Sequence, residues 1–286
     1  MTPAAKSDIL YRKIGNIELM GSLYRPTRKG PVPFVIDAHG GAWAKGDRYN
    51  NQTIHEFFAK NGIGVFALDF RLSGQAKFPD PVIDINFGVR WFKKHAASLE
   101  VETTLIGGLG SSSGAQQMGL IALQPNAATY VVEEPSLKGV DASLDFFIAC
   151  WPILDPMARF QMAKETGKQH LVEAHNTYFR EKSDMIIGNP YLVLRRGGAS
   201  HKPPIVIVQG DNDQNVDHFR ADMFADSYKR VGGKATVHKY RGQPHTFVTN
   251  HPEDPASQEA VGTLKDFIFS LIELSKKSAT SLRVDY

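Results

Sequence analysis

The sequence is poor in cysteine and has no long hydrophobic run. Its single cysteine, Cys150, cannot form an internal disulfide, so nothing in the chain requires an oxidising compartment. Cys150 follows the apolar run 146–149, which favours a buried structural thiol over a nucleophile. No segment approaches the roughly 20 apolar residues of a membrane span, and residues 1–13 lack the apolar stretch of a signal peptide. We therefore expect no membrane partner and a cytoplasmic location, although a leader removed upstream would leave no trace.

An excess of charge of one sign is also missing. Lys and Arg number 33 and Asp and Glu 30, which gives a formal net charge of +3. The basic residues are scattered, so we expect no nucleic-acid partner. The composition, 42% apolar and 22% charged, is that of an ordinary globular protein, and 286 residues can fold as one domain with a substantial core. We leave the formation of a homodimer as an open alternative.

Strand-like apolar runs alternate with helical stretches along most of the chain. This alternation predicts an α/β fold with a mostly parallel central sheet and helices on both faces. Residues 9–13 and 17–24 flank Gly15-Asn16 and predict an antiparallel hairpin. Further strands are predicted at 33–38, 64–70, from 105 onward, 144–149, 204–208 and 235–240. Helices are predicted at 53–61, 81–95, 115–123 and 258–275, with a frayed end at 276–286.

One interval interrupts this alternation. Residues 152–203 contain polar helical segments and aromatic residues but no convincing strand. An insertion of that length in a regular strand–helix chain is too long for a bare loop. We therefore predict a single domain, 1–286, with a small helical cap inserted at 152–203.

The strongest functional motif is a G-x-S-x-G sequence between a predicted strand and a predicted helix: Gly110-Ser111-Ser112-Ser113-Gly114. A sharp strand-to-helix turn holds such a serine in a strained backbone conformation, and side chains two positions away would clash. Only Ser112 has glycine at both offsets. We predict that Ser112 is a nucleophile near the positive end of the next helix. A chance match in a loop rich in glycine and serine is the alternative.

A glycine-rich turn lies upstream, directly after a predicted strand: His39-Gly40-Gly41-Ala42-Trp43. Backbone N–H groups in such a turn can approach a substrate closely and stabilise a tetrahedral oxyanion. The predicted donors are the N–H groups of Gly40, Gly41 and Ala42, together with that of Ser113. We expect His39 to order this loop through hydrogen bonds rather than act as a base. An ordinary tight turn is the alternative.

A serine nucleophile needs a base, and the base needs a carboxylate that orients it. In hydrolases with this strand–turn–helix motif, the acid and then the histidine follow the serine along the chain. The strand predicted at 204–208 is followed by a loop with three aspartates, Asp211, Asp213 and Asp217. The spacing in this loop favours Asp213 as the acid without excluding the other two. His245 follows the last predicted strand in a loop that contains glycine and proline, so it can reach Ser112.

No metal site and no cofactor are predicted. The loop that begins at Asp211 starts like a calcium loop, but its sixth position is Val216 rather than glycine and its twelfth is Asp222. His170 and His175 are five positions apart, which does not make a helical metal pair, and no Cys/His cluster supports zinc.

Together these motifs resemble the esterase branch of the α/β-hydrolase superfamily, which includes hormone-sensitive-lipase-like esterases, feruloyl- and acetyl-esterase-like proteins and kynurenine formamidase. The resemblance extends over residues 33–267 and is weakest over the predicted cap. Besides the two runs above, it rests on Gly46-Asp47, on Asp69-Phe70-Arg71-Leu72 leading to Phe78-Pro79, on the run 210–216 and on the run 242–247. The family pattern Gly-x-x-Asp-x-x-Val implies that Asp213 is the acid.

The resemblance implies a serine carboxylesterase that acts on a small-molecule ester through Ser112, His245 and Asp213. The chain departs from the family at Ala42, where a third glycine is common. Its N–H donor survives, but its methyl group narrows the approach of bulky alcohols. An arylformamidase or amidase with the same triad and a catalytically inert small-molecule receptor on the same fold are the alternatives.

Aromatic side chains in and near the predicted cap are candidates for an acyl or alcohol pocket. They are Trp43, Trp151, Phe160, Tyr178 and Phe179. Aromatic residues also dominate cores, so packing between cap and core is an equally good interpretation of each one.

Overall fold

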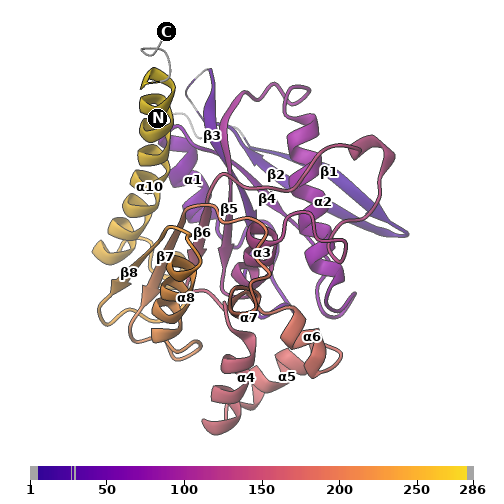
Figure 1. Cartoon of the computed structure of the whole chain (residues 1–286), viewed down its shortest axis with the longest axis vertical. Coiled ribbons are helices and arrows are strands. Elements are labelled where there is room, and N and C mark those ends of the chain that lie inside the picture. Colours follow the sequence, from indigo (N-terminus) through magenta and orange to yellow (C-terminus); the bar gives the residue numbers. More distant parts are fainter. Residues whose placement is uncertain (1–5, 27, 29, 282–286) are drawn as a thin grey trace.

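Eight strands form a single mixed sheet in the computed structural model, which describes residues 6–26, 28 and 30–281 (Figure 1). They are β1 (Lys6–Ile14), β2 (Ile17–Tyr24), β3 (Val32–Ala38), β4 (Gly64–Leu68), β5 (Thr103–Ser111), β6 (Phe147–Cys150), β7 (Ile205–Gly210) and β8 (Ala235–Tyr240). Their order in the sheet is β1-β2-β4-β3-β5-β6-β7-β8. β2 pairs antiparallel with β1 and β4, and all other neighbours are parallel.

The apolar runs of the sequence explain which strands are central. Every residue of β3, β4, β6 and β7 is buried, as expected for parallel strands covered on both faces. β1 instead alternates between exposed and half-buried positions at the sheet edge, and Gly15 turns the hairpin with a φ of 56°. The predicted α/β fold is therefore confirmed.

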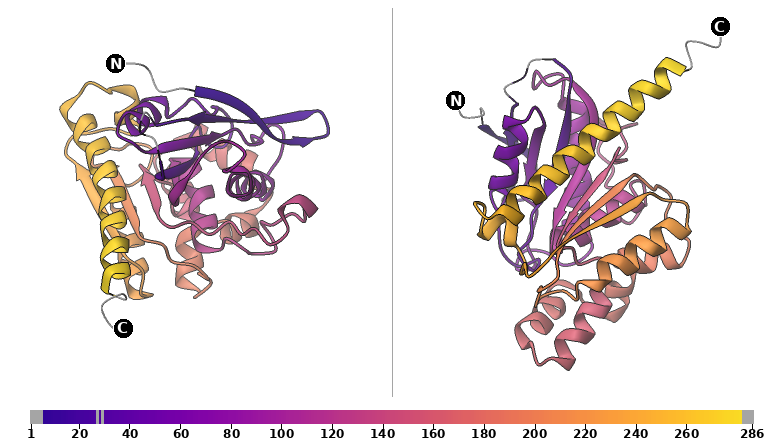
Figure 2. Two further views of the ribbon diagram at one scale, coloured as in Figure 1. Left: turned by 90° about the horizontal axis from the view of Figure 1, so that it is seen from above. Right: turned by 90° about the vertical axis from the view of Figure 1, so that its left-hand side faces the viewer.

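Helices pack on both faces of the sheet, and the sheet separates two hydrophobic core clusters (Figure 2). One face carries α1 (Gln52–Lys60), α9 (Phe247–Asn250) and α10 (Pro255–Ser281), and the other carries α2 (Asp80–His95), α3 (Ser113–Leu123), α7 (Pro190–Arg195) and α8 (Phe219–Arg230). A short 3-10 turn, η1 (Pro135–Leu137), follows α3. Within the described residues, no helix has an apolar stretch long enough to cross a bilayer.

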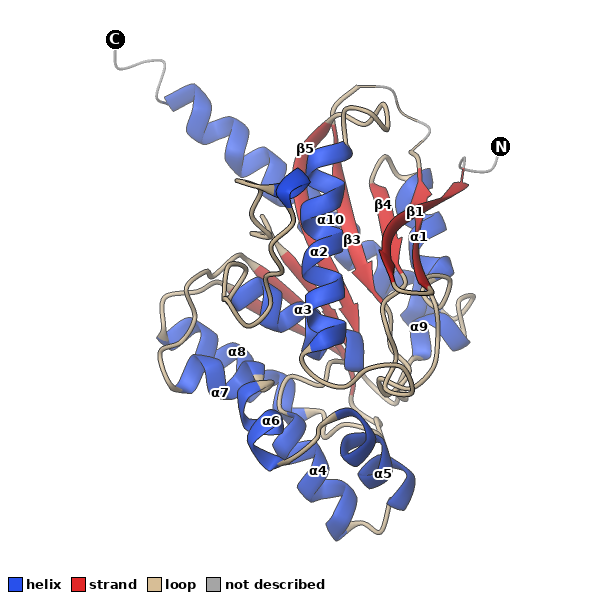
Figure 3. Ribbon diagram, turned by 90° about the vertical axis from the view of Figure 1, so that its right-hand side faces the viewer, coloured by secondary structure: helices blue, strands red, loops and turns tan. Residues whose placement is uncertain are grey.

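The interval 152–203 contains helices between β6 and β7. They are α4 (Pro156–Glu165), α5 (Gln169–Tyr178), α6 (Lys182–Ile187) and the sheet-packed α7. Figure 3 shows α4, α5 and α6 gathered beyond one end of the sheet. The division of the chain into one domain with a cap at 152–203 stays a prediction.

Two features at the C-terminal end differ from the sequence-based expectation. The expected fraying from residue 276 is wrong as far as Ser281, because α10 continues to that residue; residues 282–286 lie outside the described part. The helix α8 was not predicted. Its buried Ala221, Phe224 and Tyr228 recur at helical spacing, but charged residues between them obscure the pattern.

A buried ion cluster joins the edge of the sheet to α2. The Asp84 side chain is fully buried on α2, and it pairs with Arg12 from β1 and with Arg71 from the loop after β4. Arg71 donates from Nε at 2.8 Å, from Nη2 at 3.0 Å and from its backbone N–H at 3.1 Å. The Asp-Phe-Arg-Leu run at 69–72 therefore has a structural role, because it supplies one of the two cations of this cluster.

Replacing Asp84 with asparagine should destabilise the fold strongly. Two guanidinium groups, whose side chains are 12% and 14% exposed, would lose their shared buried carboxylate, and breaking a buried pair costs about 3 to 5 kcal/mol of unfolding free energy. Urea denaturation followed by circular dichroism measures this loss. Asp80→Asn is the matched control, because Asp80 also contacts Arg71 but its side chain is 36% exposed. Equal losses in both variants would contradict a special role of the buried cluster.

Candidate active site

Ser112 lies at the sharp turn between β5 and α3. Its φ of 50° and ψ of −115° place a non-glycine residue in a strained backbone region, as the motif predicts. Its N–H donates to the carbonyl of Cys150 at 2.9 Å, and its own carbonyl accepts from Ile153 at 3.1 Å. These bonds connect the turn to β6 and to the start of the next segment, so the surrounding sheet holds the strained conformation.

The glycines on either side of Ser112 have a steric reason. A Cβ atom at Gly114 would lie 2.0 Å from the carbonyl oxygen of Ala38, and one at Gly110 would lie 2.5 Å from the Cα of Ala115. The obstacles are backbone atoms, which cannot move aside as a flexible side chain can. The spacing of the motif therefore reflects how closely α3 approaches the end of β3.

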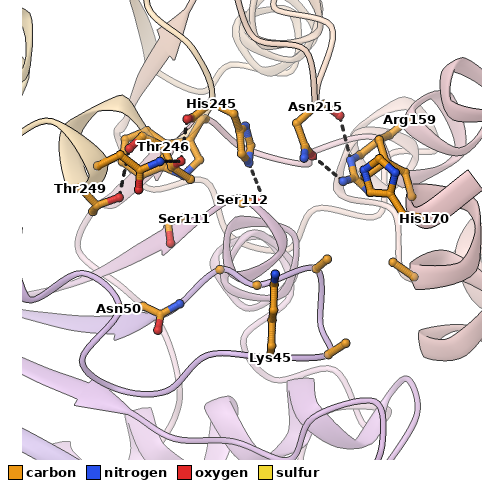
Figure 4. A pocket seen from close by; sticks show the side chains of 18 of the residues that line it. Lys45, Asn50, Ser111, Ser112, Arg159, His170, Asn215, His245, Thr246 and Thr249 are labelled. Atoms are coloured by element: carbon orange, nitrogen blue, oxygen red, sulfur yellow. Dashed lines mark hydrogen bonds between the residues drawn. The ribbon is translucent and has the colours of Figure 1, made fainter. Parts of the chain in front are cut away.

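His245 and Asp213 complete a hydrogen-bonded series with Ser112, and Figure 4 shows the bond between His245 and Ser112. His245 Nε2 lies 2.9 Å from Ser112 Oγ, and its Nδ1 lies 2.7 Å from Asp213 Oδ2. With the proton on Nδ1, that nitrogen donates to the carboxylate and Nε2 accepts from the serine hydroxyl. The loops after β5, β7 and β8 supply the three residues. Of the three aspartates left open by spacing, the structure brings Asp213 to the histidine.

Asp213 is held as a carboxylate. Its Oδ1 accepts from the N–H groups of Asn215 at 2.7 Å and Val216 at 3.0 Å, and its Oδ2 also accepts from Gln209 Nε2 at 2.9 Å. Burial raises the pKa of Asp213, but the hydrogen bond and charge of His245 and the two N–H donors outweigh it and leave the pKa below its ordinary value. The acid therefore stays ionised near neutral pH.

The turn after β3 presents unpaired N–H groups beside Ser112. Gly41 and Ala42 have φ values of 119° and 53°, and Gly40, Gly41 and Ala42 all line the same cavity as Ser112. Among the described residues, the N–H groups of Gly40, Gly41, Ala42 and Ser113 donate no hydrogen bond. Free backbone donors next to a nucleophile can stabilise an oxyanion.

Contacts to α3 fix this turn in place. The N–H of Trp43 donates to Ser113 Oγ at 3.2 Å, and its indole Nε1 donates to Gln116 at 2.9 Å. His39 is 2% exposed, stacks on Phe70 with ring centroids 4.3 Å apart, and lies 2.6 Å from the Gly40 carbonyl through Nδ1. Burial lowers the pKa of His39, which favours a neutral ring that orders the loop.

A buried polar network beneath the site was not predicted. Asn51 Nδ2 donates to Ser111 Oγ at 3.0 Å and to Asp37 at 3.1 Å, and His55 Nε2 lies 2.8 Å from the same Asp37 carboxylate. Asp37 was the available signal, because it is a lone acid inside an otherwise apolar strand. This network connects the end of β3 to the residue before Ser112.

The cavity above Ser112 has a volume of about 810 Å³ and is lined mainly by small and polar residues. Of the five aromatic candidates, Trp151 lines it and the other four do not. That expectation is corrected for Trp43, Phe160, Tyr178 and Phe179. Trp43 and Tyr178 are buried and stack on each other at 4.9 Å, whereas Phe160 and Phe179 line a separate hollow against α4 and α6.

The described residues form no metal-binding group, and their cysteine is not exposed for reaction. Residues 6–26, 28 and 30–281 contain no group of three or more His, Cys, Asp or Glu side chains placed to hold a metal ion. His175 is buried among aromatic rings, and burial together with the charge of Arg159 lowers its pKa to about 4. Cys150 is fully buried, and burial raises the pKa of its thiol.

Comparison with known families agrees with this architecture. The profile of the BD-FAE family matches residues 22–228, which is more than half of the chain. The chain therefore belongs to the BD-FAE family, a family of esterases with the α/β-hydrolase fold.

Individual relatives are distant. LipM of Mycobacterium tuberculosis, a probable carboxylic ester hydrolase, is 23% identical over 82% of this chain and 54% of its own length. A probable isoprenylcysteine alpha-carbonyl methylesterase of Arabidopsis thaliana is 23% identical over 78% of this chain and 48% of its own. The chain thus spans about half the length of these relatives. The apo structure of Thermogutta terrifontis esterase 2 matches with a TM-score of 0.75 at 22% identity, over 95% of this chain and 96% of that one, which supports the fold.

The steric argument at the nucleophile turn is testable with two glycines. Gly114→Ala should lower the unfolding free energy by about 2 to 3 kcal/mol, because the new methyl meets backbone atoms. Gly262→Ala on α10 is the control, since nothing lies within 4 Å of its Cβ position and alanine favours a helix by up to about 1 kcal/mol. Denaturant titrations of both variants give the comparison. A Gly114 variant as stable as the Gly262 variant would refute the close-approach explanation.

Proposed function

We propose that the protein is a serine carboxylesterase that hydrolyses a small to medium carboxylic ester. The observation that carries the proposal is the hydrogen-bonded series from Ser112 through His245 to Asp213, which opens on a cavity with free backbone N–H donors. Membership of an esterase family and the ester-hydrolase relatives support the reaction class. A small-molecule ester is the proposed partner.

The proposed reaction has two acyl-transfer steps. Ser112 Oγ attacks the ester carbonyl while His245 Nε2 accepts its proton, and the carboxylate of Asp213 stabilises the imidazolium that forms. His245 then returns the proton to the departing alkoxide, which leaves as an alcohol and gives an acyl-serine. A water molecule, deprotonated by His245, attacks the acyl group and releases the carboxylic acid and the free serine.

The backbone donors stabilise charge on the carbonyl oxygen in both steps. As that oxygen becomes an oxyanion, the N–H groups of Gly41, Ala42 and Ser113 are available to it because they have no other acceptor in the described chain. Removing one such donor typically costs about 3 kcal/mol in the transition state. The methyl group of Ala42 lies on the cavity wall, so it should limit bulk near the reacting carbonyl.

Ser112→Ala should abolish the hydrolysis of a short p-nitrophenyl ester, with a loss of at least about 10⁴-fold in kcat. Ser111→Ala is the matched control, because Ser111 Oγ binds Asn51 rather than His245, and this variant should keep measurable turnover. Release of p-nitrophenol and labelling by a fluorophosphonate probe report the two results. Retained turnover in Ser112→Ala would exclude Ser112 as the nucleophile.

Rates on a matched aryl ester and aryl formamide, together with the fluorophosphonate probe, separate the alternatives. An arylformamidase would cleave an aryl formamide faster than the matched aryl ester. An inert receptor would leave the fluorophosphonate probe unreacted at Ser112.

Asp213→Asn should lower kcat by about 10⁴-fold, because an asparagine amide favours the wrong histidine tautomer and cannot stabilise the imidazolium. Asp217→Asn tests a neighbouring aspartate of the same loop. We expect a change within about threefold, because the Asp217 carboxylate forms no hydrogen bond among the described residues, whereas its backbone carbonyl accepts from the N–H of Arg220. Steady-state rates on one ester give both values. A comparable loss in the two variants would contradict the assignment of the acid.

A further inference from the structure

Arg159 is a buried cation in the wall of the catalytic cavity. It lies on α4, is 3% exposed and is one of the residues that line the cavity above Ser112. Figure 4 shows it beside Asn215 and His170, on the wall near the loop that carries Asp213. Burial lowers the pKa of Arg159 to about 10, so the guanidinium keeps its positive charge at neutral pH. A buried charge normally has a partner of opposite sign, because its desolvation is costly.

Arg159 has no such partner in the described chain. Its Nε donates to the Asn215 carbonyl at 3.1 Å and its Nη2 to Asn215 Oδ1 at 2.5 Å, but its buried Nη1 has no hydrogen-bond partner. Both acceptors are neutral amide oxygens. Among the described residues, no acidic side chain forms an ion pair with Arg159. The amide contacts hold the loop, and the Trp43 ring centroid lies 5.8 Å from the guanidinium carbon, but neither group supplies a negative charge.

The nearby acids are already paired with other groups. Asp155, which begins α4, pairs with Arg220 at 3.6 Å and accepts from Asn189 at 2.8 Å. The charge of Asp213 raises the pKa of Arg159, but the Asp213 carboxylate is bonded to His245 and forms no ion pair with Arg159 among the described residues. The free positive charge therefore borders the space that a substrate occupies.

The other residues that line the cavity add little negative charge. Lys45 adds a second cation, and Glu173 is the single acidic side chain among the lining residues. Glu173 accepts from Gln169 at 3.3 Å and not from Arg159. Large apolar side chains are few in this wall, with Trp151 and Leu171 as the main ones.

We propose that the substrate is an ester that also carries a free carboxylate, and that this carboxylate pairs with Arg159. The inference rests on the proposed esterase function and specifies its substrate class. A carboxylate supplies the one negative charge that the unpaired guanidinium lacks, and its oxygens match the planar N–H donors of arginine. Arg159 is then a specificity-determining residue in addition to its contact with Asn215.

Two pairs of esters test the proposal and show which part of the substrate carries the charge. Monomethyl adipate and methyl hexanoate have six-carbon acyl chains with and without a carboxylate, and 4-acetoxybenzoate and its methyl ester differ in the same way in the alcohol part. For each pair, kcat/KM of the anionic ester is divided by that of the neutral one. In the unmodified enzyme we expect this ratio to exceed one for at least one pair.

Arg159→Gln should lower that ratio by about 30-fold or more, as expected when a buried charge pair loses one member. Lys164→Gln is the matched control, since it removes a positive charge from the exposed side of the same helix and should leave the ratio unchanged. If Arg159 only positions Asn215, its substitution will slow anionic and neutral esters by the same factor, and the proposal is then overturned. Arg159→Lys, which keeps the charge, should restore part of the ratio.

A binding measurement separates this inference from the proposed function and needs no change at Arg159. Calorimetry on Ser112→Ala should detect monomethyl adipate more tightly bound than methyl hexanoate. Equal binding, with ratios at or below one in the unmodified enzyme, overturns the carboxylate proposal while esterase activity stands. Tighter binding of the anionic ester without hydrolysis of any ester would reject the proposed function and keep the carboxylate site.

Discussion

The close approach between α3 and the end of β3 is the constraint on which the candidate site depends. The carbonyl oxygens of Ala38 and His39 lie so near Gly114 that no side chain fits between them. This approach puts the amino end of α3, with the N–H of Ser113, next to the glycine turn that follows β3. Ser112 must then make its turn in a strained conformation, and the bonds to Cys150 and Ile153 hold it there. The nucleophile and the oxyanion donors thus share one steric cause.

Buried charges in the described chain are not all paired with a charge of opposite sign. Arg90 is 5% exposed and donates from Nε, Nη1 and Nη2 to three backbone carbonyls. Asp84 and Asp37 are buried beneath the surface of the fold, and every one of their carboxylate oxygens has a donor. Arg159 is also buried, but among the described residues its Nη1 has no hydrogen-bond partner. Buried polar atoms with a structural role are expected to be hydrogen-bonded, as those of Asp84, Asp37 and Arg90 are. When a buried charge at the wall of a catalytic cavity lacks a partner, a ligand can supply that partner.

The sequence was sufficient for those parts of the site whose requirements are local. Gly110 and Gly114 stand at fixed offsets from Ser112 because the turn itself excludes side chains there, and this leaves a readable motif. The identification of Asp213 as the acid also required the family pattern, because spacing alone left three aspartates as candidates. The free donors at Gly41 and Ala42 were expected from a glycine-rich turn after a strand, whose geometry is also determined locally.

Contacts between distant segments could not be predicted in this way. Arg159 meets Asn215 across 56 positions of the chain, and only the packing of α4 against the acid loop brings them together. Trp43 and Tyr178 are pocket candidates from the sequence, with packing as an equally good interpretation, and they stack in the core, because an aromatic residue is equally suited to either place. The apolar residues of α8 recur at helical spacing in the sequence, but the charged residues between them obscure this pattern.

Cys150 offers a built-in reporter of how firmly the sheet is closed around the nucleophile. It is the only cysteine of the chain, it is fully buried at the end of β6, and its carbonyl accepts the hydrogen bond from the Ser112 N–H. A thiol reagent cannot reach it while β6 lies between β5 and β7. The rate at which such a reagent modifies the native protein therefore measures the local opening of the strand that supports Ser112.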